Sequence, residues 1–200
     1  SYTPEKFWDI VNAFRLTEGH QLLYAIAGDD AHFYDEKRMR GVGGVDDAWI
    51  MVQAKNLTPS SILSAMQAGA FYATTGSILD RVEFCPQTGT LHVAVAAEAG
   101  VNYRIEFITT KRHFDPAMRT LHLPAENNTP SRMVPLYSDD IGQVVASSTA
   151  HTASYRLAPD DLYVRARIVS DKPCQITPHF HPTLQTAWTQ PYASGTSAEA

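Results

Sequence analysis

The chain has 200 residues, of which 44% are hydrophobic and 10% aromatic. This length and composition suit one globular domain or two small ones, and they argue against a disordered chain. The formal net charge of -5, without a block of Lys and Arg, argues against nucleic acid as a partner. No run of about 18 apolar residues is present, so we expect no membrane span.

The start of the chain and its two cysteines leave the compartment open. The first residues are Ser-Tyr-Thr-Pro rather than a basic and then apolar leader, so we expect no targeting segment. Because the chain does not begin with Met, we expect a processed start or a fragment. Cys85 and Cys174 match no metal or redox spacing and are either two buried thiols or one disulfide.

Two helices are predicted from their start signals. Thr3 caps the first, Pro4 suits its first position, and apolar residues then recur at helical spacing up to Gly19. That apolar face consists of Phe7, Trp8, Ile10, Val11 and Phe14. Thr58-Pro59 repeats the start signal, and the second helix should end near Gly69.

An apolar run leads directly into side chains that bind metals. Leu22 to Ala27 predicts a strand covered on both faces, and Asp29, Asp30 and His32 follow its carboxyl end. Asp30 and His32 are two apart, so an extended backbone points both to one side. A carboxylate with an imidazole suits Zn²⁺, Mn²⁺ or Fe. The alternative is an ordinary turn or a helix cap.

Further strands are expected on both sides of residue 80. Ala48 to Gln53 and Phe71 to Gly76 would complete an α/β layer over residues 1–80. Beyond it, short runs with turn punctuation predict an antiparallel β-sandwich over residues 81–193, followed by a flexible tail at 194–200. In the run from Leu162 to Val169, alternation places Leu162, Val164, Ala166 and Ile168 inward and Tyr163, Arg165 and Arg167 outward.

Several blocks occur in the order typical of one enzyme family. They are Phe7-Trp8-Asp9, Asp29-Asp30-Ala31-His32, Trp49-Ile50-Met51-Val52, Leu57-Thr58, Ala65-Met66-Gln67-Ala68-Gly69, Phe71-Tyr72-Ala73-Thr74-Thr75-Gly76 and Ala187-Trp188-Thr189-Gln190-Pro191. With them the chain resembles the C-terminal part of a PHP-type (polymerase and histidinol phosphatase) metal-dependent phosphoesterase. The resemblance runs through most of residues 5–80 and returns at 162–191.

The resemblance implies a fold and a site. The family folds as a distorted seven-stranded, TIM-like β/α barrel with a metal centre that hydrolyses phosphoesters. It therefore implies an α+β protein, with the C-terminal portion of such a barrel at 1–80 followed by the β-sandwich. Asp30 and His32 would bind the divalent metal (Zn, Mn or Fe), and Asp29 would be catalytic. Lys37, Arg38 and Arg40 either contact a phosphorylated small-molecule substrate or only solvate a loop.

The family's other metal ligands belong to strands that precede any in this chain. They would come from a preceding segment or from a second copy in a homodimer, and these residues alone should be weakly active or inactive. His179-Phe180-His181 lies between prolines and is more typical of an exposed loop than of a metal site. The alternative function is a non-catalytic β-sandwich binding module on a remnant α/β platform.

Overall fold

The structure, a computed structural model, describes residues 2–29, 31, 47–126, 129–174 and 184–193. Within these residues the helices are α1 (Pro4–Thr17) and α2 (Pro59–Gln67). The strands there are β1 (Trp49–Val52), β2 (Phe71–Thr74), β3 (Leu79–Cys85), β4 (Thr90–Val95), β5 (Tyr103–Thr109), β6 (Arg119–Leu123), β7 (Arg132–Leu136), β8 (Gln143–Ser148), β9 (Thr152–Arg156), β10 (Arg165–Pro173) and β11 (Leu184–Thr189).

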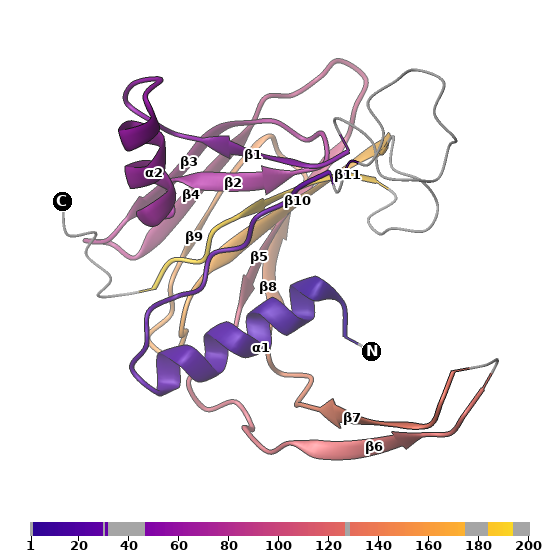
Figure 1. The fold of residues 1–200 in the computed structure, drawn as a ribbon. Helices are drawn as coiled ribbons and strands as arrows, with labels where there is room; N and C mark the ends of the chain where they lie inside the picture. Colours follow the sequence, from indigo (N-terminus) through magenta and orange to yellow (C-terminus); the bar gives the residue numbers. More distant parts are fainter. Residues whose placement is uncertain (1, 30, 32–46, 127–128, 175–183, 194–200) are drawn as a thin grey trace.

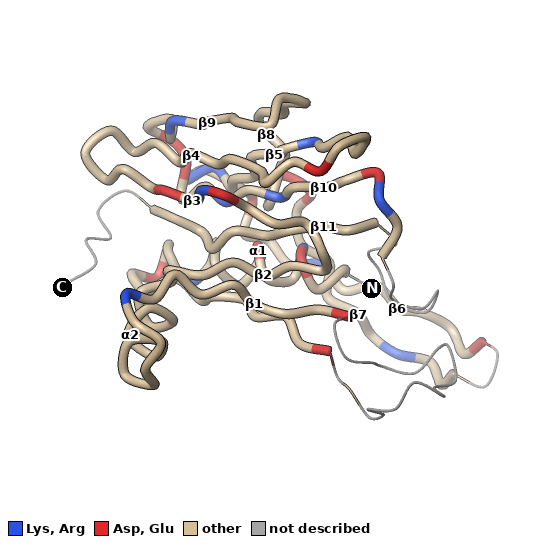
Figure 2. The backbone as a smooth tube through the Cα atoms, turned by 90° about the horizontal axis from the view of Figure 1, so that it is seen from above, with Lys and Arg blue, Asp and Glu red and all other residues tan. Residues whose placement is uncertain are grey.

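The strands form two facing sheets and a separate ribbon. The large sheet has six strands in the order β1-β2-β11-β10-β5-β8, and the small sheet has three in the order β3-β4-β9. Figure 2 shows the strands of the large sheet side by side in that order, with β2 and β1 lying beyond β3. The third sheet is the pair β6-β7, which projects below α1 in Figure 1.

The main core lies between the two facing sheets. The small sheet contributes Leu91, Val93 and Val95, and the large sheet contributes residues such as Ile105 and Ile168, all of them buried. Alternate residues of each strand point into this layer, which is why β4 is buried at every second position. Burial of these apolar side chains is the main force that holds the sheets together.

Both helices begin as their sequences predict. The Thr3 hydroxyl accepts a hydrogen bond from the Lys6 N–H at 3.2 Å, and the Thr58 hydroxyl accepts one from the Ser61 N–H at 3.3 Å. A proline follows each cap inside the first turn. Gly69 has a φ of +70° just after α2, which is the left-handed conformation that commonly ends a helix.

Helix α1 covers the outer face of the large sheet, but its buried face differs from the expected one. Ile10 and Ala13 pack with Phe114, Leu162 and Tyr163 in a second core cluster. Two polar residues of the helix, Asp9 and Asn12, are also buried, whereas Phe7 is 59% exposed. The helix is therefore turned so that Asp9 faces Arg165 of β10 and Asn12 faces the backbone of Leu23, and each has hydrogen-bond partners.

The prediction of a β/α barrel segment over residues 1–80 is wrong. Every strand pairing in the described residues is antiparallel, and the sheets are open. A β/α barrel needs parallel strands, but β1 and β2 pair with each other and β2 then pairs with β11 in the large sheet. The described fold is therefore mainly β rather than α+β.

One finer prediction also fails. Leu22 to Ala27 is not a strand, and Ile26 within it is 72% exposed instead of covered on both faces. Tyr163 and Arg165 face outward as alternation predicts, yet they are 0% and 1% exposed. They do point away from the sandwich core, but α1 covers that face of the sheet. Strand alternation predicts which face a residue is on, not what covers that face.

Candidate functional site

Residues 22–29, which we call the 22–29 segment, carry the chain to the predicted metal motif. The segment runs beside β11 and β10 without joining the sheet (Figure 1). Asn12 of α1 binds Leu23 twice, accepting from its N–H at 2.7 Å and donating to its carbonyl at 3.1 Å. Trp8 donates its indole N–H to the same carbonyl at 2.7 Å. Side chains thus replace a neighbouring strand for the backbone of Leu23.

The second half of the segment is held in the same way. The Gln190 side chain, 1% exposed, accepts from the Ala25 N–H at 2.9 Å and donates to the Ala25 carbonyl at 2.8 Å. The Tyr24 ring lies against Gly69 and edge-on to the ring of Phe71, with centroids 6.1 Å apart. A Cβ at position 69 would lie 2.5 Å from Tyr24 Cζ, so a glycine is needed there.

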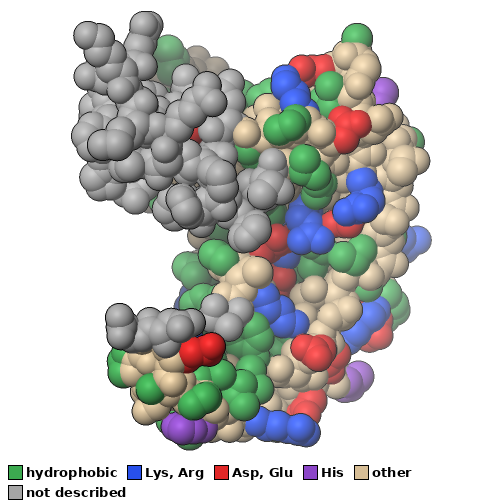
Figure 3. All heavy atoms as spheres, turned by 90° about the vertical axis from the view of Figure 1, so that its right-hand side faces the viewer, with side chains coloured by type: hydrophobic (Ala, Val, Ile, Leu, Met, Phe, Trp, Pro, Cys, Tyr) green, Lys and Arg blue, Asp and Glu red, His purple; other side chains and the backbone are tan. Residues whose placement is uncertain are grey.

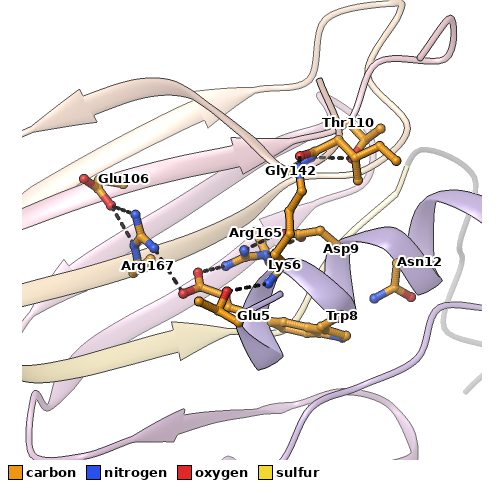
Figure 4. A network of polar contacts seen from close by, with 12 residues as sticks. Glu5, Lys6, Trp8, Asp9, Asn12, Glu106, Thr110, Gly142, Arg165 and Arg167 are labelled. Atoms are coloured by element: carbon orange, nitrogen blue, oxygen red, sulfur yellow. Dashed lines mark hydrogen bonds and ion pairs between the residues drawn. The ribbon is translucent and has the colours of Figure 1, made fainter. Parts of the chain in front are cut away.

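The helix that holds the segment is itself fixed by an ionic ladder. We use this name for six side chains of alternating charge on α1, β10 and β5. In order they are Asp9, Arg165, Glu5, Arg167, Glu106 and Arg104. Three acids and three arginines make the ladder neutral, and Figure 4 shows its contacts around Arg165 and Arg167.

The buried end of the ladder is the pair of Asp9 and Arg165. Arg165 donates from Nε to Asp9 Oδ1 at 2.8 Å and from Nη2 to Asp9 Oδ2 at 2.6 Å, and its Nη1 donates to Glu5 at 2.8 Å. Asp9 also accepts from the Tyr163 hydroxyl at 2.7 Å. The guanidinium carbon lies 5.0 Å from the Trp8 ring centroid, so Arg165 and the 22–29 segment share Trp8 as a neighbour.

A short polar chain extends this cluster to the loop before β8. The Thr110 and Tyr163 hydroxyls lie 3.0 Å apart, and the Gly142 N–H donates to Thr110 Oγ1 at 2.9 Å. Lys6 of α1 donates to the carbonyls of Ser138, Asp139 and Ile141 in the same loop. No buried side-chain donor or acceptor among the described residues lacks a partner. The helix is therefore docked by satisfied polar contacts.

The pKa shifts in the ladder follow from burial and charge. Burial alone would raise the pKa of Glu5, but the neighbouring Arg165 and Arg167 outweigh it and hold the pKa below its ordinary value. Burial would lower the pKa of Arg165, yet the hydrogen bonds and charge of Asp9 raise it above its ordinary value. Burial, together with the charge of Asp9, raises the pKa of Tyr163 well above 10.0. All three groups therefore keep one protonation state near neutral pH.

Asp29 stands at the end of the 22–29 segment, where its Oδ1 accepts a hydrogen bond from the Ala48 N–H at 2.8 Å. This hydrogen bond joins residue 29 to residue 48. The other predicted site residues lie outside the described residues, namely Asp30, His32, Lys37, Arg38, Arg40, His179 and His181. Within the described ranges, no three His, Cys, Asp or Glu side chains are grouped to hold a metal.

Asp161 is buried and accepts hydrogen bonds from the Ala158 N–H, the Tyr155 hydroxyl and Lys111, so it fixes a turn. Both cysteines are free thiols, so they do not form the disulfide that the sequence left open, and each is only partly buried. Burial raises the pKa of Cys174, and hydrogen bonding to Thr88 lowers that of Cys85.

The visible surface shows no concentration of one charge sign. On the face drawn in Figure 3, side chains of Lys, Arg, Asp and Glu are interspersed, and apolar side chains gather toward the lower end, where β6 and β7 lie. Neither described helix is long and apolar enough to cross a bilayer.

The sequence places Trp8 on the apolar helix face and Gln190 within a family block, but it does not predict that these residues and Asn12 anchor the 22–29 segment. A usable signal was present for the ladder: Glu5 and Asp9 are four apart on one helix face, and Arg165 and Arg167 are two apart on one strand face. Asn12 and Gln190 carry no comparable signal, because a single amide gives no spacing pattern. Comparisons with protein-family models, with curated proteins and with solved structures found no match to this chain.

Proposed function

We propose that this chain contributes metal ligands to a metal-dependent phosphoesterase of the PHP type. The observation that carries the proposal is the anchoring of the 22–29 segment. Five hydrogen bonds from Trp8, Asn12 and Gln190 hold Leu23 and Ala25 just before the Asp30-x-His32 motif. All three anchoring side chains are buried. Fixing a surface segment with buried amides is typical of a site whose ligands must be positioned.

The residue types fit the proposed metal. One carboxylate and one imidazole suit Zn, Mn or Fe, with Asp30 and His32 as the ligands from this chain. When bound, such a metal lowers the pKa of a coordinated water and neutralises charge on phosphoryl oxygens. We assign Asp29 to the substrate side of the site and Lys37, Arg38 and Arg40 to the phosphate of a small-molecule substrate. Because two ligands under-coordinate a hydrolytic metal, we expect these residues alone to hydrolyse phosphoesters weakly or not at all.

Metal content tests the proposal. The chain is incubated with Zn²⁺ or Mn²⁺, dialysed and analysed by mass spectrometry, together with Asp30→Ala and His32→Ala. Each replacement should remove the bound metal. His113 and Asp115 provide a matched control, because they are the same residue types two apart on the exposed surface.

The control replacements His113→Ala and Asp115→Ala should leave the metal content unchanged. A wild-type chain that retains no metal would contradict the proposal, as would equal losses in the control variants. Either result would favour a non-catalytic module instead. Hydrolysis of p-nitrophenyl phosphate by the loaded chain, measured alongside, should stay close to the metal-free rate.

A further inference from the structure

A groove of about 530 Å³ lies between the two sheets at one edge of the sandwich. Its walls come from three strands: β1 and β2 of the large sheet and β3 of the small one. Met51 and Tyr72 point into the groove from the large sheet, and Val82 and Phe84 lie on β3 opposite. In Figure 2, β2 and β1 extend beyond β3, which is the last strand of the small sheet among the described residues.

The edge of β3 that borders the groove presents backbone hydrogen-bonding groups. The Leu157 N–H donates to the Gly89 carbonyl, and the Val95 N–H donates to the His151 carbonyl. With the β4-β9 register, these two bonds show that the odd-numbered residues of β4 hydrogen-bond to β9. The even-numbered residues of β4 therefore bond to β3, through Arg81, Glu83 and Cys85. The N–H and C=O groups of Val82 and Phe84 consequently point away from β4, along the free edge of the small sheet.

The side chains of β3 alternate between the two faces of the small sheet. Val82 and Phe84 pack on the main core, while Arg81 and Glu83 form an ion pair on the outer face. On the opposite wall Met51 lies across from Tyr72 on the same face of its sheet and is 39% exposed. A strand added beside β3 would cover Met51 with its inward side chains and leave its outward ones in solvent.

We propose that this groove binds one extended peptide strand of another protein, which pairs with β3 and turns alternate apolar side chains toward Met51 and Tyr72. The free backbone edge selects an extended peptide over a small apolar ligand, because main-chain hydrogen bonds supply the affinity in strand addition. Residues 194–200 do not supply such a strand, since they contain no apolar residue larger than Ala. A second copy fits less well, because its edge strand arrives with a neighbouring strand attached.

The probe is an array of octapeptides in which Val, Ile, Leu or Phe alternates with Thr, Lys or Glu. Each peptide is printed beside a copy that is N-methylated at alternate amides. We expect the labelled protein to bind a subset of the peptides but not their N-methylated copies. The methylated amides are the ones that would hydrogen-bond to the outer edge of β3 at Val82. Binding no better than to the N-methylated copies would overturn the proposal.

Two pairs of variants locate the bound peptide. Val82→Pro removes an outward N–H without breaking the β3-β4 ladder and should weaken binding at least about tenfold. Its control is Ser154→Pro, an outward position on β9 at the other edge of the same sheet, which should bind as the wild type does. Met51→Glu should also abolish binding, whereas Leu57→Glu, at a 95% exposed position outside the groove, should not.

Thermal unfolding of each variant checks that the fold is retained. Equal losses of binding in Val82→Pro and Ser154→Pro would overturn the proposal. Self-association of the chain that Val82→Pro abolishes would identify a second copy as the occupant and would overturn it as well.

Discussion

Replacement of Asp9 by Ala should strongly destabilise the protein. Asp9 is 2% exposed and accepts three hydrogen bonds, two from Arg165 and one from Tyr163. Without it, the buried Arg165 guanidinium retains Glu5 as its remaining carboxylate partner among those described. The Tyr163 hydroxyl retains its hydrogen bond with the Thr110 hydroxyl. Removing one partner of a buried ion pair typically destabilises a protein by about 3–5 kcal/mol. That is a large part of the roughly 5–15 kcal/mol that stabilises a folded domain.

Urea denaturation followed by tryptophan fluorescence measures this loss, since Trp8 lies beside the Arg165 guanidinium. The exposed Asp139→Ala is the control and should change stability by less than about 0.5 kcal/mol. The double replacement Asp9→Leu with Arg165→Met should recover most of the loss, because a buried pair is often neutral against apolar residues of similar size. A loss below about 1 kcal/mol in Asp9→Ala would refute the ladder as the anchor of α1.

Two further predictions concern the same region. The pKa of Glu5 is lowered in the folded protein, so Glu5 adds stability above its ordinary pKa of 4.5, and this contribution is lost as the pH falls through the folded value. Urea midpoints of Glu5→Gln should therefore fall less steeply than those of the wild type as the pH drops below 4.5, and parallel curves would contradict this. Gly142→Ala should destabilise by more than about 1 kcal/mol, because φ is +66° and the new Cβ would lie 2.5 Å from Asp9 Oδ2. In urea denaturation Gly100→Ala, at φ +79° with open space around it, should lose less, and equal losses would speak against the close approach to Asp9.

Local signals in the sequence were more informative than its overall pattern. The Thr-Pro starts of both helices and the strands predicted within Ala48 to Gln53 and Phe71 to Gly76 are found where the sequence predicts them. Leu22 to Ala27 has the composition of a buried strand, but its backbone bonds to Asn12 and Gln190 instead of to a strand. An apolar run indicates that a segment packs, and it does not identify the groups that satisfy its backbone.

The sheet arrangement could not be derived from short-range pattern. β2 pairs with β11, more than 100 residues further along the chain, so no local spacing reports their contact. The buried arginine shows the same limit: Arg165 lies on the face predicted from alternation, and only the docking of α1 buries it. For the candidate site, the sequence supplied the metal-binding residue types, and the fold supplied the anchors that precede them.

We propose that buried side chains position the Asp30-x-His32 motif, and the most direct test is the affinity for Zn²⁺ of a variant that loses one anchor. Asn12→Ala removes two of the hydrogen bonds to Leu23 and leaves Asp30 and His32 unchanged. In isothermal titration it should bind Zn²⁺ at least about tenfold more weakly than the wild type, and the exposed Asn56→Ala should bind normally. Wild-type affinity in Asn12→Ala would contradict the claim.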